Sequence, residues 1–404
     1  MNALFLTALL LLTLAIYGVW EYRNHKFHLN HIPTRIHVNG TRGKSSVTRL
    51  IAAGLRCSGR KVIAKTTGTE PRIILDDGHE IPIYRVGKPN IIEQLTIVRF
   101  AWERKAEILV IECMAVHPSL QKFAEDKVIH STVGVITNAR ADHLDEMGPT
   151  VADVAAALSL TIPRKGVLFT ADRDWISVFQ KEATNRSSAV VLSESRDVTE
   201  EEMRGFSYVE HRENVALALK VCNHFGVSRD RALESMQNSN PDPGVLKAFL
   251  VHFQNKQILF YNAFAANDRD STLLIYDRLQ LKNSRENPIM IVVNNRGDRL
   301  QRAEQFGRMI AKDLDARCFF LVGDFTRATE EIAIRAGMTP DRIVNLNHAT
   351  PEEVFEAILT KTERNCTVLG VGNIGGLGKD LVMYFKNRGE EWLKLQSDSA
   401  LSSV

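Results

Sequence analysis

Residues 35–55, RIHVNGTRGKSSVTRLIAAGL, contain an apolar run, a glycine turn and a helical pattern in immediate succession. The run that ends at Asn39 has the composition of a buried strand, and Val47, Leu50 and Ile51 recur at the spacing of one helix face. A strand that leads into a helix through a short turn is the repeating unit of parallel α/β folds. This feature therefore restricts the fold more than any other part of the sequence.

The turn itself has the residue types that hold phosphate groups. Gly40 and Gly43 allow backbone N–H groups to approach an anion, and the N-terminus of the following helix adds positive potential. Lys44 can neutralise phosphate charge, and the Ser45 hydroxyl can bind Mg²⁺. Val38 stands where the full G-x-x-x-x-G-K-[ST] pattern has its first glycine, so a surface turn that contains Gly-Lys-Ser by coincidence is the alternative.

Strand-like apolar runs continue along the chain and alternate with helical patterns. Their unbroken apolar character predicts strands buried on both faces, and hence largely parallel sheets. The segment QNSNPDPGVLK, residues 237–247, clusters Asn, Asp, Pro and Gly and predicts a linker. We therefore expect an α/β protein with a P-loop-type parallel-sheet ATPase domain at 34–240. A smaller Rossmann-like α/β domain is expected at 241–394, followed by a tail at 395–404.

The N-terminal stretch has a different character. No charged side chain occurs from Met1 to Trp20, and as a helix the apolar part spans roughly 27 Å, close to the hydrocarbon core of a bilayer. The absence of a basic start and of a small-x-small site argues against a cleaved signal peptide. Arg23 and Lys26 follow, so the positive-inside rule places the remaining chain in the cytoplasm. We expect a single-pass anchor in the cell membrane at 1–22, a linker at 23–33 and a cytoplasmic catalytic part, with a buried or cleaved helix as the alternative.

Composition excludes several classes of protein. The formal net charge of +3 is too small to indicate a nucleic-acid partner. The five cysteines are scattered and contain no C-x-x-C pair, which favours free thiols over disulfides or a zinc site.

Polar side chains follow two further strand-like runs. Glu112 ends the run ILVIE, and TNARADHLD, residues 137–145, follows the run TVGVIT. The carboxyl ends of parallel strands face the crevice in which open α/β sheets bind ligands. Asp142 and His143 can therefore join Glu112 in holding a metal or moving a proton. A solvated glutamate and a structural histidine are the alternatives for each feature taken alone.

Four motifs occur in a fixed order: GTRGKSS (40–46), IECMAVHPSL (111–120), TNARADHLD (137–145) and HRENVALAL (211–219). They resemble the G-T-x-G-K-[ST]-[ST], strand-end glutamate, T-N-x-x-x-D-H-x-D and H-x-x-N-x-x-A-A-x-A motifs of the Mur-type amide ligases, which include folylpolyglutamate synthase. The resemblance runs from about Arg35 to the C-terminus. It implies an ATP-dependent acid–amino-acid ligase that forms carbon–nitrogen bonds and releases ADP, with ATP and Mg²⁺ as cofactors.

The resemblance also implies a role for individual residues. The implied catalytic residues are Lys44, Glu112 and His143. The implied metal ligands are Ser45, Glu112 and His143. Nucleotide contacts are implied for Gly40, Thr41, Arg42, Gly43, Lys44, Ser45, Ser46, Asn138 and Asn214. In the C-terminal domain, the implied substrate-binding residues are Asn267 and Arg299. For Asn214, a packing position on a helix face is the alternative.

Three positions depart from the pattern of the family. Leu158 stands where many members carry a carbamylated lysine, Val245 where an arginine often contacts the nucleotide, and Ala266 replaces the histidine of A-H-N-P. A membrane helix stands in place of the usual N-terminal sugar-nucleotide domain. The chain combines this anchor with GTRGKSS and GVGNIGGLG (370–378). In this combination it resembles the catalytic subunit of bacterial poly-γ-glutamate synthase, a capsule-forming ligase.

This resemblance implies a reaction. The γ-carboxylate of glutamate is activated as an acyl phosphate and coupled to the amine of another glutamate, which builds poly-γ-glutamate for capsule or export. The implied partners are glutamate, the growing polymer and other membrane subunits of the complex, without nucleic acid; a homo-oligomer is left open. The alternatives are a ligase that adds glutamate to a small acceptor, a P-loop ATPase subunit that drives export, and a non-catalytic scaffold. Residues 370–375 fit G-x-G-x-x-G, but too little chain follows for an NAD site.

Overall fold

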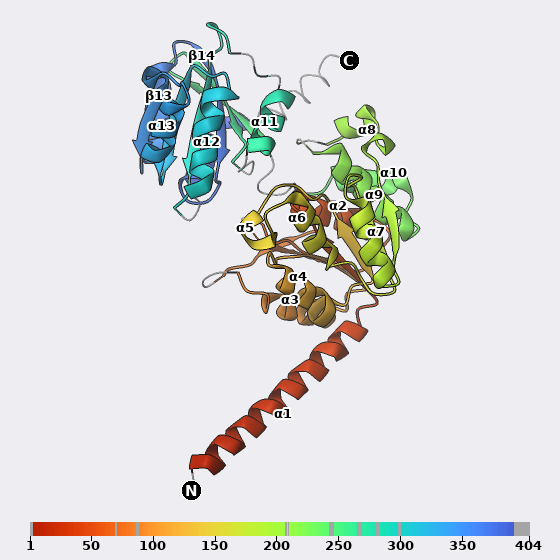
Figure 1. The fold of residues 1–404 in the computed structure, drawn as a ribbon. Coiled ribbons are helices and arrows are strands. Elements are labelled where there is room, and N and C mark those ends of the chain that lie inside the picture. The colour runs from red at the N-terminus through yellow and green to blue at the C-terminus, as the bar shows by residue number, and fades with distance from the viewer. Residues whose placement is uncertain are drawn as a thin grey trace. The chain divides into compact units, whose positions relative to one another are not determined.

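Two compact units make up the chain (Figure 1). The computed structural model describes residues 3–68, 71–85, 89–206, 208, 210–241, 246–264, 269–279, 281, 283–297 and 300–391. Unit 1 comprises Met1–Phe206 and Glu210–Asp242, and unit 2 comprises Ser207–Val209 and Pro243–Val404. The division between the units falls in the segment expected to be a linker, of which residues 242–245 lie outside the described part.

Unit 1 is built on an eight-stranded sheet with the order β4-β3-β2-β5-β1-β6-β7-β8. The strands from β2 to β8 in this order run parallel, whereas β3 and β4 are antiparallel additions at one edge. The run ILVIE is buried along its whole length, as expected for a strand with helices on both faces. The strands are β1 (Thr34–Asn39), β2 (Val62–Lys65), β3 (Arg72–Ile74), β4 (Glu80–Pro82), β5 (Ile108–Glu112), β6 (Val133–Ile136), β7 (Val167–Thr170) and β8 (Ala189–Leu192).

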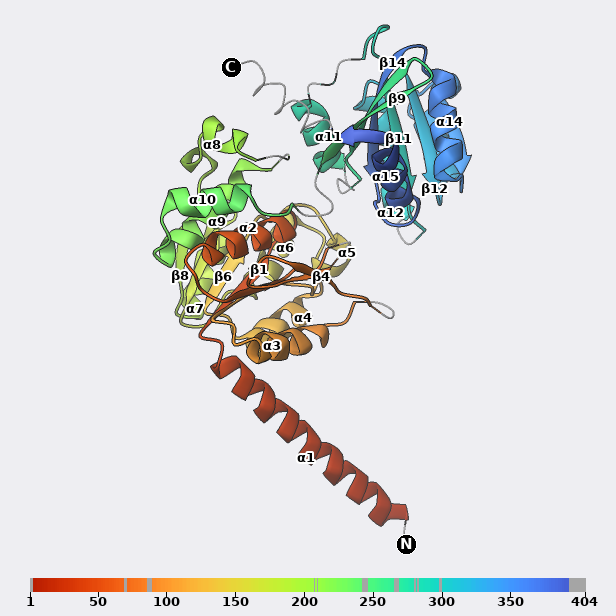
Figure 2. The same ribbon diagram turned by 180° about the vertical axis from the view of Figure 1, so that it is seen from behind.

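Helices cover both faces of this sheet (Figure 2). One face carries α2 (Lys44–Arg56), α9 (Arg212–His224) and α10 (Arg229–Gln237), which pack against one another. The other face carries α3 (Glu93–Glu103), α4 (Pro118–Phe123), the π-helix η1 (Ala124–Ile129), α6 (Val151–Ser159) and α7 (Ile176–Asn185). Short elements complete the unit: α5 (Leu144–Met147), the 3-10 helix η2 (Ser195–Asp197) and α8 (Glu200–Arg204).

The parallel register brings three strand ends together. Val38 lies opposite Glu112 of β5, and Asn39 lies opposite Ile136 of β6. The loops that follow β1, β5 and β6 therefore start from the same edge of the sheet, which is where open α/β sheets bind ligands.

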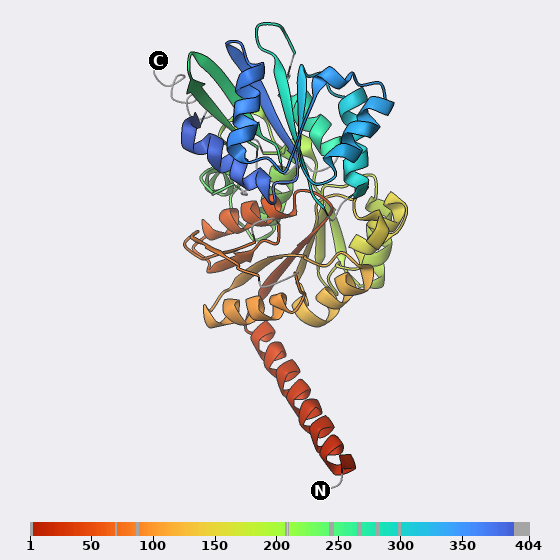
Figure 3. The ribbon, with the colours of Figure 1, turned by 90° about the vertical axis from the view of Figure 1, so that its left-hand side faces the viewer.

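Helix α1 (Ala3–Asn30) runs without a break from the apolar N-terminal stretch to unit 1 (Figure 3). Large apolar side chains between Phe5 and Trp20 are exposed. Within the described residues, this is the one helix long and apolar enough to cross a membrane.

Residues 23–33 are not the linker that the sequence suggested. The segment is mostly the last two turns of α1, which pack on α3: the His28 ring stacks on Trp102 at a centroid distance of 4.4 Å. Leu29 and Ile32 are buried in the core beneath α3. The expectation failed because histidines in a polar segment usually indicate solvent exposure, whereas His25 and His28 are buried against unit 1.

Unit 2 is built on a seven-stranded sheet with the order β13-β12-β11-β14-β10-β9-β15. The strands from β13 to β10 run parallel, and β9 and β15 add antiparallel at the other edge. Its strands are β9 (Lys247–Phe253), β10 (Lys256–Asn262), β11 (Ile289–Asn295), β12 (Cys318–Gly323), β13 (Ile343–Asn347), β14 (Asn365–Gly372) and β15 (Gly389–Glu391). Its helices are α11 (Arg269–Arg278), α12 (Leu300–Lys312), α13 (Thr326–Arg335), the 3-10 helix η3 (Pro340–Arg342), α14 (Pro351–Lys361) and α15 (Leu377–Arg388).

The predicted fold class is confirmed in both units. Each has a largely parallel sheet, and in unit 2 two separate apolar clusters lie on the two faces of the sheet. Neighbouring residues of β11 belong to different clusters, Met290 to one and Ile291 to the other. This explains why its sequence is a continuous apolar run rather than an alternating pattern.

Two truncations should separate the apolar part of α1 from its docked end. A fragment that starts at Glu21 keeps His28 and Leu29, whereas one that starts at His31 loses both. Loss of a buried leucine and of the ring contact with Trp102 should lower the free energy of unfolding by about 3–5 kcal/mol. Urea unfolding followed by tryptophan fluorescence measures the difference; equal midpoints would show that the docked turns add no stability.

Candidate active site

The turn after β1 needs glycine at two positions. Gly40 has φ +134° and Gly43 has φ +79°, in the region that L-residues rarely adopt. A Cβ on Gly40 would lie 2.0 Å from Thr137 Oγ1, and a Cβ on Gly43 would lie 2.8 Å from Asn214 Oδ1. Both glycines are required because the turn is held between the loop after β6 and helix α9.

Asn138 joins the loop after β6 to the glycine turn. Its carbonyl oxygen accepts the Thr41 N–H at 2.9 Å, and its Oδ1 accepts the Thr41 hydroxyl at 2.6 Å and the Arg42 N–H at 3.1 Å. The Arg42 carbonyl in turn accepts Asn138 Nδ2 at 3.2 Å and Thr137 Oγ1 at 2.6 Å. Two motifs predicted separately are thus one hydrogen-bonded unit, in which Asn138 shapes the turn; its nucleotide contact stays a prediction.

The Arg42 side chain makes a second link between the same loops. Its Nη2 lies 3.3 Å from Asp142 Oδ2, with the two side chains 23% and 10% exposed. Asp142 Oδ1 accepts the N–H of His143, whose φ of +49° turns the chain into α5. The ion pair therefore positions the histidine loop, and a direct contact of Arg42 with nucleotide stays a prediction.

Lys44 begins α2, and its ammonium group lies inside the curve of the turn. Nζ donates to the carbonyl oxygens of Gly40 at 2.7 Å and Thr41 at 3.3 Å. Ser46 follows in the first turn of α2 and is partly buried. A lysine charge and the N-terminus of a long helix act on the same small volume, an arrangement suited to phosphate groups.

Ser45 and Glu112 come from different elements and are in contact. The Ser45 hydroxyl donates to Glu112 Oε2 at 2.8 Å, and the Thr67 N–H donates to the same oxygen at 2.6 Å. Glu112 is 2% exposed. A buried carboxylate beside a hydroxyl provides the hard oxygen ligands that Mg²⁺ takes, so this pair fits the metal site implied for it.

His143 and Leu158 line the same pocket. Among the residues that the structure describes, no three His, Cys, Asp or Glu side chains converge into a ready metal site. Leu158 is buried and has no ligand atom, so His143 would need oxygens from phosphate or substrate to hold a second metal. The metal role of His143 stays a prediction.

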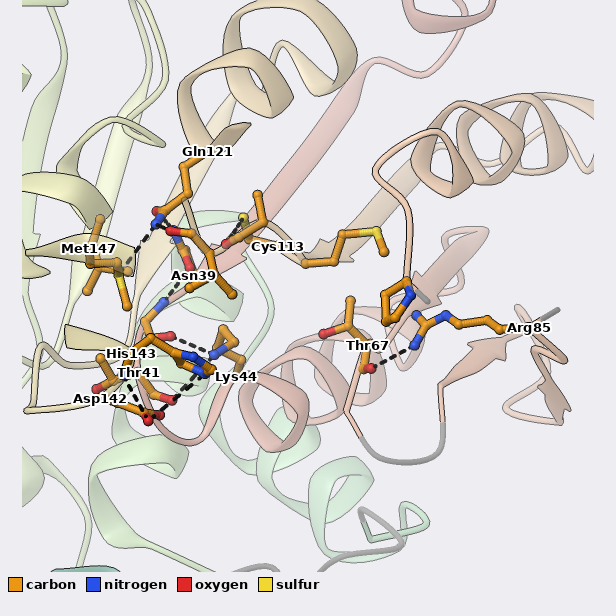
Figure 4. A pocket seen from close by; sticks show the side chains of 16 residues that line it. Asn39, Thr41, Lys44, Thr67, Arg85, Cys113, Gln121, Asp142, His143 and Met147 are labelled. Atoms are coloured by element: carbon orange, nitrogen blue, oxygen red, sulfur yellow. Dashed lines mark hydrogen bonds and ion pairs between the residues drawn. The ribbon is translucent and has the colours of Figure 1, made fainter. Parts of the chain in front are cut away.

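A pocket of about 170 Å³ joins these elements (Figure 4). Lys44 and His143 lie on one side, and Thr67 and Arg85 lie on the other. The pocket thus has Lys44 and His143 on its phosphate-binding side and an arginine on the opposite side, where Thr67 also contacts Glu112.

Asn214 lies against the turn from α9. It is 4% exposed, and its Nδ2 donates to Glu210 Oε1 at 2.9 Å. The structure brings Asn214 to Gly43, in agreement with a site made of both elements. Its contact with adenine stays a prediction.

The candidate substrate residues of unit 2, Asn267 and Arg299, lie outside the described residues, as do Val245 and Ala266. The glycine loop after β14 lies within the described residues. Asn294, at the end of β11, donates through Nδ2 to the carbonyl oxygens of Asn373 and Gly375, the latter at 3.1 Å. A Cβ on Gly372 would lie 2.4 Å from the carbonyl oxygen of Asn294, which gives this glycine a structural role within unit 2.

Similarity to known proteins extends over most of the chain. The capsule biosynthesis protein CapB of Bacillus anthracis is 36% identical over 94% of this chain and 82% of its own length. The PGA synthase CapB of Bacillus subtilis (strain 168) is 35% identical over 91% of this chain and 94% of its own length. Residues 38–228 match the Mur ligase middle domain, and residues 248–388 match the poly-gamma-glutamate synthase CapB C-terminal domain. The chain belongs to the CapB family.

The fold of this CapB-family chain agrees with that of a solved ligase. The bifunctional folylpolyglutamate synthase/dihydrofolate synthase of Yersinia pestis, complexed with AMPPNP and a Mn ion, matches with a TM-score of 0.66 at 13% identity. The match covers 90% of this chain and 92% of that structure. The structural match confirms the fold, and the matches to the Mur ligase middle domain and to the two CapB proteins confirm the expected family of Mur-type, ATP-dependent amide ligases.

The CapB-family pocket has a buried polar floor that the sequence interpretation missed. His37 is fully buried, and its Nδ1 lies 2.9 Å from Glu125 Oε2. Burial alone would lower the pKa of His37, but the Cys113 sulfur and the Glu125 carboxylate raise it to about 10. Asn39 Nδ2 donates to Gln121 Oε1 at 2.8 Å, and Asn39, Cys113 and Gln121 line the pocket. The available signal was RIHVN, where the polar residues alternate and so share one face of the strand.

Gly43→Ala should weaken nucleotide binding through its collision with Asn214. We expect the dissociation constant for an ATP analogue to rise about tenfold or more, equivalent to at least about 1.4 kcal/mol. Gly59→Ala is the matched control, because Gly59 has φ +81° but no atom within 4 Å of an added Cβ. Isothermal titration calorimetry compares the two, and equal affinities would show that the Asn214 contact does not shape the site.

The His37–Glu125 pair should make the protein less stable at high pH. Since the pKa of His37 rises from 6.5 to about 10 on folding, its contribution is complete below about pH 6.5 and is lost as pH rises through about 10. Glu125→Gln should reduce this slope in part, because Cys113 also raises the pKa of His37. Urea midpoints between pH 6 and pH 11 test this, and a slope unchanged in Glu125→Gln would contradict it.

Proposed function

We propose that the protein is a membrane-anchored ligase that builds poly-γ-glutamate for capsule or export, with ATP and Mg²⁺. The observation that carries this proposal is similarity over nearly the whole length of a PGA synthase, at 35% identity. The contact between Ser45 and Glu112 beside the glycine turn supports it, because a phosphate-binding turn and a metal-binding carboxylate meet at one point.

The proposed reaction has two steps. A γ-carboxylate oxygen attacks the terminal phosphorus of ATP, the bond to ADP breaks, and an acyl phosphate forms. The neutral amine of a second glutamate then attacks the acyl carbon, phosphate leaves and the amine loses a proton. Activation is needed because hydroxide is a poor leaving group from a carboxylate.

In this proposal the chain supplies positioned charge rather than a nucleophile. The glycine turn and Lys44 bind the phosphates and offset the charge on the transferring group. Mg²⁺, held by Ser45 and Glu112, would neutralise phosphate charge as a Lewis acid. His143, positioned by Asp142, faces the same pocket and would act on the carboxylate or on a second metal. Asn267 and Arg299 of unit 2 would bind the incoming glutamate.

The proposed location is the cell membrane, with both units in the cytoplasm. Helix α1 exposes its apolar side chains over a length that spans a bilayer, and Arg23 and Lys26 follow the apolar part. A product too large to diffuse across the membrane requires a partner that exports it, so other membrane subunits are part of the proposal.

The full-length chain in membranes, given Mg-ATP and labelled glutamate, should form labelled polymer and ADP. Lys44→Ala should reduce the rate by about 100-fold or more, as expected for a main charge contact of phosphoryl transfer. Lys181→Ala, which removes an exposed lysine, is the control. Gel sizing of the product tests the proposal: label confined to a small acceptor would favour a folylpolyglutamate synthase-like ligase, and ADP release independent of glutamate would favour an export ATPase.

A further inference from the structure

Two cations and one carboxylate lie at the side of the pocket across from Lys44, and of these three Arg85 lines the pocket itself. Lys65, the last residue of β2, is fully buried beside it. Both contact Glu93: Oε1 lies 2.7 Å from Lys65 Nζ, and Oε2 lies 2.6 Å from Arg85 Nε. Two positive charges therefore share one negative charge.

The electrostatics of this cluster favour a further anion. Burial would raise the pKa of Glu93, but the hydrogen bond from Arg85 and the charge of Lys65 lower it to about 2. Burial lowers the pKa of Lys65, against the opposing effects of Glu93 and Glu112. Glu112 is committed to the metal-binding side of the pocket in the proposed function. A buried ammonium that shares its counter-ion with an arginine is stabilised when a second carboxylate arrives.

The geometry of Arg85 suits a carboxylate ligand. Its side chain is 17% exposed, and its Nη1 makes only a long contact, 3.5 Å, with the Thr67 carbonyl oxygen. Nε and Nη2 of Arg85 already bind the two oxygens of Glu93, at 2.6 and 2.9 Å, so the edge made by Nη1 and Nη2 is the one that can offer two parallel hydrogen bonds to a further carboxylate. Lys44 and His143 lie across the pocket from Arg85 (Figure 4), so an anion at Arg85 is separate from the phosphates.

A glutamyl residue carries two carboxylates on a short aliphatic spacer. One pocket connects the phosphate-binding side with Arg85, so a residue with two carboxylates can place one of them at each side. We propose that Arg85, with Lys65 buried beside it, binds the α-carboxylate of the glutamyl residue whose γ-carboxylate is phosphorylated. The inference rests on the proposed function and makes Arg85 a specificity-determining residue for the chain end.

The test compares two probes that differ by one carboxylate. One is tetra-γ-glutamate; the other is the same peptide with 4-aminobutyrate as its terminal residue, which keeps the carboxylate to be activated and lacks the α-carboxylate. Affinities are measured by calorimetry on the full-length chain in detergent, with Mg²⁺ and a non-hydrolysable ATP analogue. The wild type should bind tetra-γ-glutamate about 10–100-fold more tightly, the effect of a charged, bidentate hydrogen bond.

Arg85→Gln should reduce this preference to about threefold or less. Arg99→Gln is the matched control, because Arg99 is 65% exposed on α3 and pairs with Glu103. Arg85→Lys keeps the positive charge but lacks the planar fork, so its preference for tetra-γ-glutamate should lie between those of the wild type and Arg85→Gln. This variant replaces Arg85→Gln in the test if Arg85→Gln fails to fold. Glu93→Gln removes the competing carboxylate and should keep the preference.

Three results would overturn the inference: a wild type without preference, an Arg85→Gln protein that keeps the preference, or equal loss of affinity for both peptides. The last result would identify Arg85 as structural only. Because binding is measured without turnover, the outcome is independent of polymer synthesis. A wild type that shows the preference but makes no polymer would contradict the proposed function and support the carboxylate site.

Discussion

The close contact between Gly43 and Asn214 is the constraint on which the rest of the site depends. With φ of +79°, Gly43 directs the chain into α2, and this direction places Lys44 under the turn and Ser45 beside Glu112. A side chain at Gly43 would collide with α9, so the position of one helix relative to the turn is set by the absence of a single Cβ. Candidate catalytic groups from three strand ends are brought together around this turn without any covalent cross-link.

Most of the fold and the core of the site could be predicted from the sequence. Long apolar runs such as the one ending at Glu112 identified central strands, because burial on both faces leaves a continuous apolar sequence. Short edge strands such as Arg72–Ile74 and Gly389–Glu391 carry no such pattern and were missed. The convergence of Glu112 with the glycine turn followed from parallel topology, since adjacent strand ends meet at one edge. The pairing of Ser45 with Glu112 followed from the family resemblance.

The rest depended on tertiary contacts that no local pattern encodes. In the sequence, Lys65 and His37 look like ordinary polar residues within strands. Both are fully buried, and each pairs with a carboxylate. Isolated buried charges are costly, and the partners that stabilise these two, Glu93 and Glu125, come from helices distant in the sequence. Arg42 was similarly ambiguous, because its ion pair with Asp142 arises only when two loops are brought together.

The unbroken helix α1 has a mechanical consequence. His25 and His28 are packed against unit 1, and the same helix continues into the apolar segment. The segment proposed to cross the membrane is therefore connected to unit 1 by helix and not by a flexible linker. Each residue of a helix turns its neighbour by about 100° and advances it by about 1.5 Å. In an anchored state, the number of residues between Trp20 and His25 thus sets the distance of unit 1 from the lipid surface. The direction in which α1 docks on α3 sets which side of unit 1 faces that surface.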